Sequence, residues 1–157
     1  MKISIWSVGK ANEAYVNEGI AMFSKRISNY YNLEWKIIPS PKNAASLSPE
    51  DLKKAEGIVV LNQMLPGDLL ILLDEKGEKF SSEQLASLIQ TKADKGTKNL
   101  VFLIGGAYGV SDAVVSKANT IWSLSTLVFP HQLVRLILAE QIYRACTIQR
   151  NEKYHHN

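Results

Sequence analysis

The sequence contains a single cysteine, Cys146, and this scarcity restricts the chemistry that the chain can support. One thiol cannot form an intrachain disulfide, and a cysteine-based metal site requires several thiols. Cys146 also lies within an apolar, helix-like pattern, which favours a small buried side chain over a reactive one. We therefore expect neither a disulfide nor a bound metal.

Long hydrophobic runs are also missing. The longest, LLILL at 69–73, is far shorter than the roughly 20 residues that a membrane-spanning helix requires. The opening MKISIWSVGK has too short an apolar run for a signal peptide. These absences predict a cytoplasmic protein with no membrane association.

Charge of either sign is modest. Eighteen Lys and Arg residues face fifteen Asp and Glu residues, for a formal net charge of +3. This weakly basic balance is compatible with nucleic acid but does not by itself indicate it. A length of 157 residues suits one domain, so we treat residues 1–157 as a single unit.

The familiar nucleotide-binding and catalytic motifs are absent too. The glycines of IGGAYG at 104–109 have the spacing G-G-x-x-G, which fits neither the dinucleotide fingerprint nor the P-loop. HExxH, CxxC and GxSxG do not occur. These absences argue against a classical nicotinamide or nucleoside-triphosphate enzyme, and the glycines serve either a tight turn or close approach to a ligand.

What is present is a regular alternation of strand-like and helix-like segments. Strands are predicted at 2–8, 33–37, 68–74, 99–104 and 121–124. Helices are predicted after Asn12 and over 48–63, 82–96, 111–117 and 130–150. Asn12 and Ser48 are the expected N-caps of the first two, and Gly96 is expected to end the third. This order predicts an α/β fold, with a mostly parallel sheet covered by helices on both faces.

Ligands of such sheets bind beyond the carboxyl ends of the strands. Three loops follow predicted strands at that edge: Gly105-Gly106, residues 74–77 and residues 125–129. We expect them to converge on one site.

The last predicted helix is apolar over more than one stripe. Such a helix is either deeply buried or packed against a second subunit, and a terminal helix in a short chain favours a dimer. Glu140 and Arg144 have the spacing of a helix-surface ion pair. Arg135 has no partner at that spacing, which leaves an RNA-phosphate contact or a plain surface charge.

Several motifs together resemble one family. IGGAYG, WSLS, TLVFPHQLVRLILAEQIYRA and a closing Arg-x-Glu-x-Tyr-His follow the opening ISIWSVGK. In this combination the whole chain resembles the bacterial large-subunit ribosomal RNA pseudouridine N3-methyltransferases, which belong to the SPOUT, or α/β-knot, superfamily.

The resemblance implies a C-terminal trefoil knot, a homodimer, S-adenosylmethionine as cofactor and 23S ribosomal RNA, within the ribosome or large subunit, as partner. The cofactor-binding positions that it implies are Leu73, Gly105, Leu124, Ser125, Thr126, Leu127, Val128 and Phe129. They fall in the three loops placed at the sheet edge above. Gly105 would let the backbone approach the adenosine, and Gly106 would complete the turn.

The chain departs from the family's pattern in places. Asn151 replaces a common glycine in the tail, Val110 stands where leucine is frequent, and the segment 42–64 is shorter than in many members. None of these departures touches the cofactor loops, although the changed tail could affect how the substrate is held.

The implied reaction transfers a methyl group from a sulfonium to a ring nitrogen, N3, that first has to lose its proton. A base or a positively charged environment would help. His131 and His155 are the candidate bases, and a reaction that uses neither stays open. Tyr154 could stack on the target base, and Arg135 and His155 could contact RNA. The simpler alternatives are a polar first-turn residue for His131 and a disordered tail for Tyr154 and His155.

Three other functions stay open at this point. The chain could be a knotted methyltransferase for another RNA such as tRNA, or a non-catalytic dimer that associates with the ribosome. It could also be a flavodoxin-like nucleotide-binding module, which would be an unknotted monomer.

Overall fold

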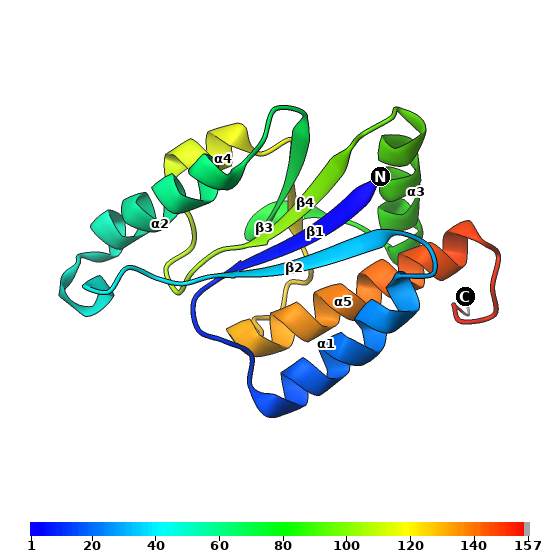
Figure 1. Cartoon of the computed structure of the whole chain (residues 1–157), viewed down its shortest axis with the longest axis horizontal. Helices are drawn as coiled ribbons and strands as arrows, with labels where there is room; N and C mark the ends of the chain where they lie inside the picture. Colours follow the sequence, from blue (N-terminus) through cyan, green and yellow to red (C-terminus); the bar gives the residue numbers. More distant parts are fainter. Residues whose placement is uncertain (156–157) are drawn as a thin grey trace.

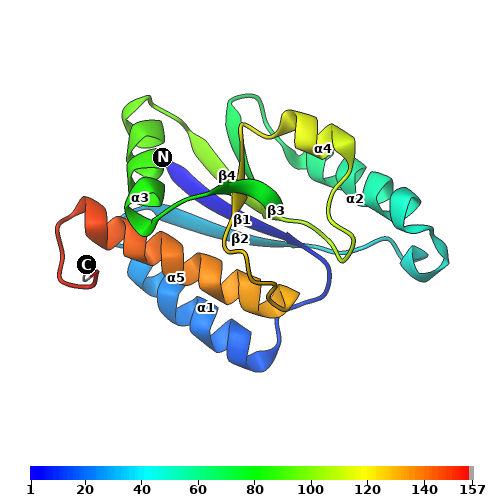
Figure 2. The same cartoon turned by 180° about the vertical axis from the view of Figure 1, so that it is seen from behind.

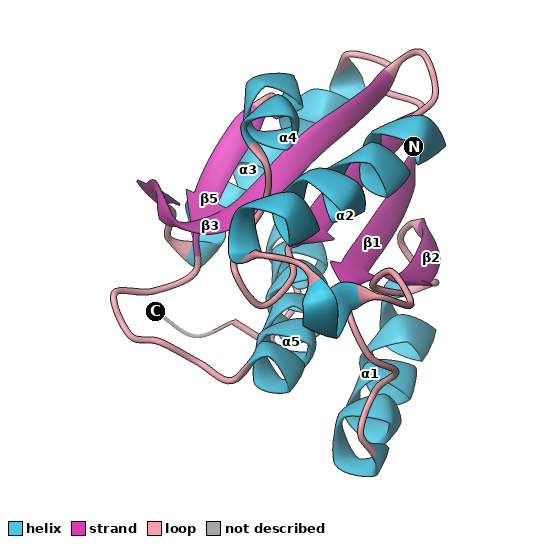
Figure 3. Cartoon of the chain, turned by 90° about the vertical axis from the view of Figure 1, so that its left-hand side faces the viewer, coloured by secondary structure: helices cyan, strands magenta, loops and turns pink. Residues whose placement is uncertain are grey.

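A five-stranded, entirely parallel sheet forms the centre of the computed structural model, which describes residues 1–155 (Figure 1). The strands are β1 (Lys2–Val8), β2 (Asn32–Ile38), β3 (Asp68–Lys79), β4 (Asn99–Ile104) and β5 (Thr120–Ser123). Their order across the sheet is β2-β1-β4-β3-β5. Figure 3 shows β3 and β5 together at one side of the sheet and β2 at the other.

Helices cover both faces, as predicted (Figures 1 and 2). They are α1 (Ala14–Ile27), α2 (Pro49–Gln63), α3 (Ser82–Asp94), α4 (Asp112–Lys117) and α5 (His131–Gln149), with a short 3-10 helix, η1 (Ala44–Ser46). One hydrophobic cluster joins the sheet to α1, α3 and α5, and a second joins it to α2 and α4. Cys146 lies buried in the first cluster, and burial raises the pKa of its thiol to about 12. None of the helices in residues 1–155 is long and apolar enough to cross a membrane.

The helix ends follow the predicted signals with one exception. The Ser48 side chain caps α2 by accepting from the Asp51 N–H at 3.1 Å, and Gly96 ends α3 with φ +74. The prediction of Asn12 as N-cap of α1 is wrong, because Glu13 takes that position without a side-chain cap. The Asn12 side chain instead accepts a hydrogen bond from Arg135.

β3 is longer than the predicted 68–74 because it pairs with β5 twice. Leu73 pairs with Trp122, the strand bulges, and Glu78 then pairs with the same Trp122. Gly77 lies within this bulge, where a Cβ would stand 2.6 Å from the Ile121 backbone. This close approach requires glycine, and the bulge places residues 74–77 at the carboxyl edge of the sheet.

Candidate active site

A pocket of about 510 Å³ lies at the carboxyl edge of the sheet, where the three predicted loops meet. Its wall is formed by residues 73–76, 104–110, 122–125, 127–129 and 134. The convergence predicted from strand order is therefore confirmed. All the predicted cofactor-binding residues line the pocket except Thr126.

The wall combines apolar surface, carboxylates and backbone. Leu73 and Phe129 contribute apolar side chains, while Asp74 and Glu75 contribute acidic ones. Trp122 also belongs to the wall, and its indole nitrogen is buried without a hydrogen-bond partner in the described chain. Such a wall suits an organic cation that carries polar groups.

The rim of the pocket carries exposed apolar side chains. Tyr108 is 59% exposed, Leu127 69% and Val128 87%. Tyr108 belongs to the GGAYG motif, whose glycine spacing does not indicate where this side chain lies. Its exposed position above a pocket depends on the turn around it, which a strand-and-helix pattern does not describe.

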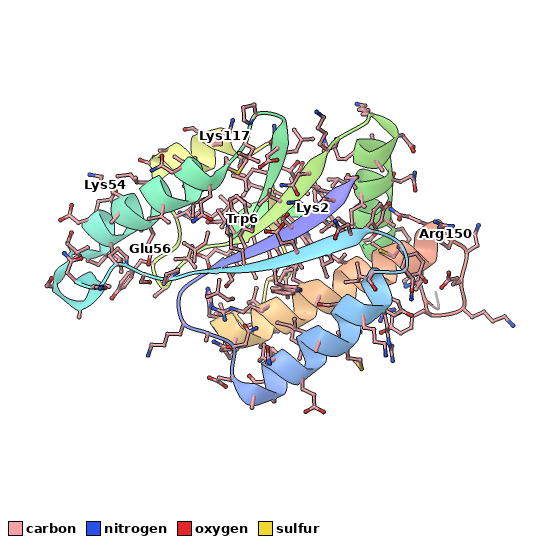
Figure 4. All side chains as sticks on the ribbon, in the orientation of Figure 1. Lys2, Trp6, Lys54, Glu56, Lys117 and Arg150 are labelled. Atoms are coloured by element: carbon pink, nitrogen blue, oxygen red, sulfur yellow. The ribbon has the colours of Figure 1, made fainter. Side chains whose placement is uncertain are left out.

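The glycine loop is a tight turn in which Gly109, at φ +86, donates its N–H to the Gly106 carbonyl at 3.1 Å. A Cβ on Gly105 would stand 2.7 Å from Val110 Cγ1 and 3.2 Å from the Gly109 backbone. The missing side chain of Gly105 therefore makes room for the loop itself, and the expected approach of its backbone to the adenosine stays a prediction. A Cβ on Gly106 would likewise collide with the buried carboxylate of Glu56, which extends from α2 (Figure 4).

His131 lies behind the pocket, and both of its ring nitrogens are engaged. Nε2 is 2.6 Å from the Gly105 carbonyl oxygen, and Nδ1 is 3.3 Å from Nη2 of Arg135. Because a carbonyl only accepts and a guanidinium only donates, Nε2 carries the proton and Nδ1 accepts. Burial, and then the Arg135 charge, lower the pKa of the imidazole, against an opposing effect of the Gly105 carbonyl.

Arg135 is fully buried, with a relative exposure of 0%. Its Nη1 donates to the Lys10 carbonyl and to Asn12 Oδ1, both at 2.8 Å. The expectation of an exposed Arg135, as a surface charge or a phosphate contact, is therefore wrong. The i, i+4 spacing predicts ion-pair partners only within one helix, whereas Arg135 has partners in the loop after β1.

The predicted ion pair on α5 is present, and it anchors the tail. Arg144 pairs with Glu140, and its guanidinium lies 4.9 Å from the centre of the Tyr154 ring. The Tyr154 ring also packs edge-on against Tyr143, with ring centres 4.7 Å apart. His155 Nε2 lies 2.7 Å from the Glu83 carboxylate. The described part of the tail is thus packed on α5 and α3 rather than disordered.

The tail follows the last turn of α5 and folds back along the helix as far as Glu140, which accepts from the Tyr154 hydroxyl. The pocket contacts α5 at Val134, in the first turn, and none of the described tail residues belongs to its wall. Within one chain, the structure therefore does not bring Tyr154 and His155 together with the predicted cofactor-binding residues.

Comparisons with known proteins agree with this arrangement. The family model described as "Predicted SPOUT methyltransferase" matches residues 1–155. A Cytophaga hutchinsonii protein named ribosomal RNA large subunit methyltransferase H is 49% identical over 99% of this chain and 100% of its own length. Proteins of the same name from Parabacteroides distasonis and Desulforamulus reducens are 44% and 42% identical, each over 99% of both chains. The chain belongs to the SPOUT methyltransferase family.

Proposed function

We propose that this protein is an S-adenosylmethionine-dependent methyltransferase that methylates N3 of a pseudouridine in 23S ribosomal RNA. One observation carries the proposal: the cofactor positions implied by the family converge, from three separate loops, on a single pocket. The relatives named ribosomal RNA large subunit methyltransferase H support RNA of the large subunit as substrate. Residues 1–157 would act as one domain, in the cytoplasm.

The residues of the pocket fit the cofactor. Asp74 and Glu75 supply negative charge for its cationic amino and sulfonium groups, and Leu73 and Phe129 supply apolar surface for the adenine. The turn at 105–109 offers backbone groups to its polar edges. The family also implies a trefoil knot, and the double pairing of β3 with β5 would supply a fixed loop for such a crossing.

The bound cofactor would supply an activated methyl group for in-line displacement by N3. The protein would mainly align the reacting atoms, because most of the gain in such a reaction comes from position. Residues 127–129 and Tyr108 would limit the access of water on the rim. A neighbouring positive charge or a base would favour loss of the N3 proton.

We further propose a homodimer in which the tail of one subunit completes the site of the other. Tyr154 offers an aromatic face for the target base, and His155 offers a titratable nitrogen. Neither residue lines the pocket of its own chain, so we propose that they serve the pocket of a second copy. Packing along α5 would place the two chains in that relation.

The proposal is tested with the purified protein in two measurements. Calorimetry should show that S-adenosylmethionine binds, with one cofactor site per chain. Radiolabelled methyl transfer should then modify large subunits from a strain that lacks this protein, and tRNA should remain unlabelled. Binding without transfer to any RNA would favour a non-catalytic ribosome-associated dimer, and labelled tRNA would identify a different substrate.

A further inference from the structure

Arg135 is the one Lys or Arg side chain among residues 1–155 that is buried. In that part of the chain, no carboxylate lies within 4.0 Å of its guanidinium, and its Nε has no hydrogen-bond partner. Burying an uncompensated charge is costly, and a chain rarely keeps one without a role. The environment of Arg135 indicates what that role is.

The hydrogen bonds of Arg135 join two loops at the pocket edge. Nη1 holds the Lys10 carbonyl and the Asn12 side chain, in the loop after β1. Nη2 holds Nδ1 of His131, whose Nε2 reaches the Gly105 carbonyl in the loop after β4. Because β1 and β4 are neighbours in the sheet, one guanidinium fixes the ends of two adjacent strands.

His131 is poorly placed for the general-base role considered above. Its only lone pair, on Nδ1, accepts from Arg135, and a protonated Nδ1 would face a second positive charge. In addition, neither His131 nor Arg135 belongs to the pocket wall that the described residues form. The imidazole can therefore act on the pocket only through the Gly105 carbonyl.

We propose that Arg135 and His131 are positioning residues that hold the glycine loop in its cofactor-binding shape. Arg135 keeps the imidazole in its neutral Nε2–H form, and the Nε2–H fixes the Gly105 carbonyl. This inference rests on the proposed function, because the glycine loop is expected to bind S-adenosylmethionine. Arg135 thus has a role, but through buried hydrogen bonds rather than through RNA phosphates.

The discriminating variants are His131→Gln and His131→Leu. Glutamine keeps a donor and an acceptor but cannot serve as a base at neutral pH, whereas leucine removes both groups. We expect His131→Leu to weaken S-adenosylmethionine binding by about tenfold or more, measured by calorimetry, and His131→Gln to restore it to within about threefold. Methyl transfer should follow the same order.

Gln132 provides a matched control. It also anchors the loop after β1, through the Ala11 carbonyl and the Glu13 N–H, but it has no hydrogen bond to the glycine loop. Arg135→Met should weaken cofactor binding about tenfold, while Gln132→Ala should change it less than threefold. Equal losses in the two variants would reduce Arg135 to an anchor of the first loop and overturn the inference.

The protonation of His131 gives an independent readout. Arg135 and Glu56 are the charged groups that act on its ring, with opposite effects on its pKa. The chain has three histidines, so the ring resonances of His131 can be assigned by their loss in His131→Gln. Its titration midpoint should lie below the ordinary value of about 6.5 and should rise in Arg135→Met.

Three further results would overturn the inference, and one would bear on the proposed function instead. A midpoint at or above the ordinary value would contradict a neutral ring held by Arg135. His131→Gln as inactive as His131→Leu, with cofactor affinity unchanged in both, would restore His131 as the base. Unchanged cofactor affinity in Arg135→Met would exclude a role of Arg135 in holding the glycine loop. If the wild-type protein failed to bind S-adenosylmethionine at all, the proposed function itself would fail.

Discussion

Gly105 lies where β4 ends and the pocket wall begins, and its missing side chain is required by its own loop. The nearest atom to a Cβ there would be Val110 Cγ1, at 2.7 Å, followed by the Gly109 backbone. The fit between Gly105 and Val110 is therefore already tight. Cofactor binding therefore depends on how the turn folds, as well as on what it touches.

We predict that Gly105→Ala weakens S-adenosylmethionine binding and that adding Val110→Ala restores part of the loss. The single variant should cost about 1–3 kcal/mol, because overpacking displaces the turn. The second substitution removes the closest colliding atom. Calorimetry on both proteins is the measurement, with Val110→Ala alone as control. No recovery in the double variant would show that the added methyl collides with the cofactor rather than with Val110.

Asn151 departs from the family's common glycine, and the structure explains why the change is tolerated. It has φ 54, the one positive φ at a non-glycine residue in the described chain. The Glu152 N–H donates to the Thr147 carbonyl at 2.9 Å, and the Asn151 N–H donates to the Ile148 carbonyl at 3.1 Å. This is a Schellman ending of α5, and asparagine is among the residues that accept its left-handed position.

We predict that Asn151→Ala lowers the free energy of unfolding by about 1 kcal/mol, while Asn151→Gly leaves it nearly unchanged. Alanine has neither the local polar group of asparagine nor the freedom of glycine. Chemical denaturation of the three proteins provides the comparison. Equal stability of the alanine and glycine variants would mean that the left-handed residue carries no strain.

At the scale of elements, the tail is a short segment anchored on the last turns of α5. Tyr154 packs against Tyr143 and Arg144, and its hydroxyl donates to Glu140 at 3.2 Å. These contacts lie from the middle of α5 onward, and none of the described tail residues lines the pocket. The tail can therefore be removed or altered without disturbing the pocket of its own chain.

We predict that deleting residues 154–157, of which 156 and 157 lie outside the described part, preserves cofactor affinity but lowers methyl transfer by well over tenfold. The expected loss is a base-stacking contact worth about 1–3 kcal/mol, together with the His155 nitrogen. Calorimetry and radiolabelled transfer to large subunits are measured on the same preparations. Tyr154→Phe, which keeps the ring but loses the hydroxyl, should retain most of the transfer.

Two outcomes of the tail deletion would contradict this account. Full transfer by the truncated protein would reduce the tail to a packed end without a role in substrate binding. Lost cofactor affinity would show that the tail closes over the cofactor rather than over the RNA.

For the whole molecule, the wide apolar surface of α5 is explained partly by burial within the chain and partly by a face left for a partner subunit. Much of it is buried inside the chain, because α5 packs into the cluster that it shares with α1, α3 and the sheet. Leu133 and Ile137 are only half-buried and belong to neither core cluster of the described residues. They leave a smaller apolar face that suits a partner subunit.

We predict a homodimer whose mass by light scattering is twice 17.5 kDa at micromolar concentration. Introducing charge with Leu133→Glu and Ile137→Glu should shift the protein toward monomer, because a charged side chain in an apolar interface loses its hydration. Exposed Met22→Glu on α1 serves as the control. A monomeric wild-type protein would remove the composite site from the account.

Much of this architecture could be predicted from sequence because it depends on local signals. Alternating strand and helix patterns give a parallel sheet, and the edge rule then places the loops after Leu73, Ile104 and Ser123 together. The predictions failed where a residue's environment comes from distant segments. Arg135 was expected at the surface because its partners lie in the loop after β1, and the extension of β3 was missed because only its second pairing with β5 makes that polar stretch a strand.

Mass spectrometry of 23S ribosomal RNA from a strain that lacks this protein tests the central claim most directly. The account predicts that one pseudouridine loses a methyl group and that a plasmid carrying the wild-type chain restores it. A plasmid carrying the chain truncated after Lys153 should not restore it. Ribosomal RNA whose methylation is identical with and without the protein would contradict the proposed function.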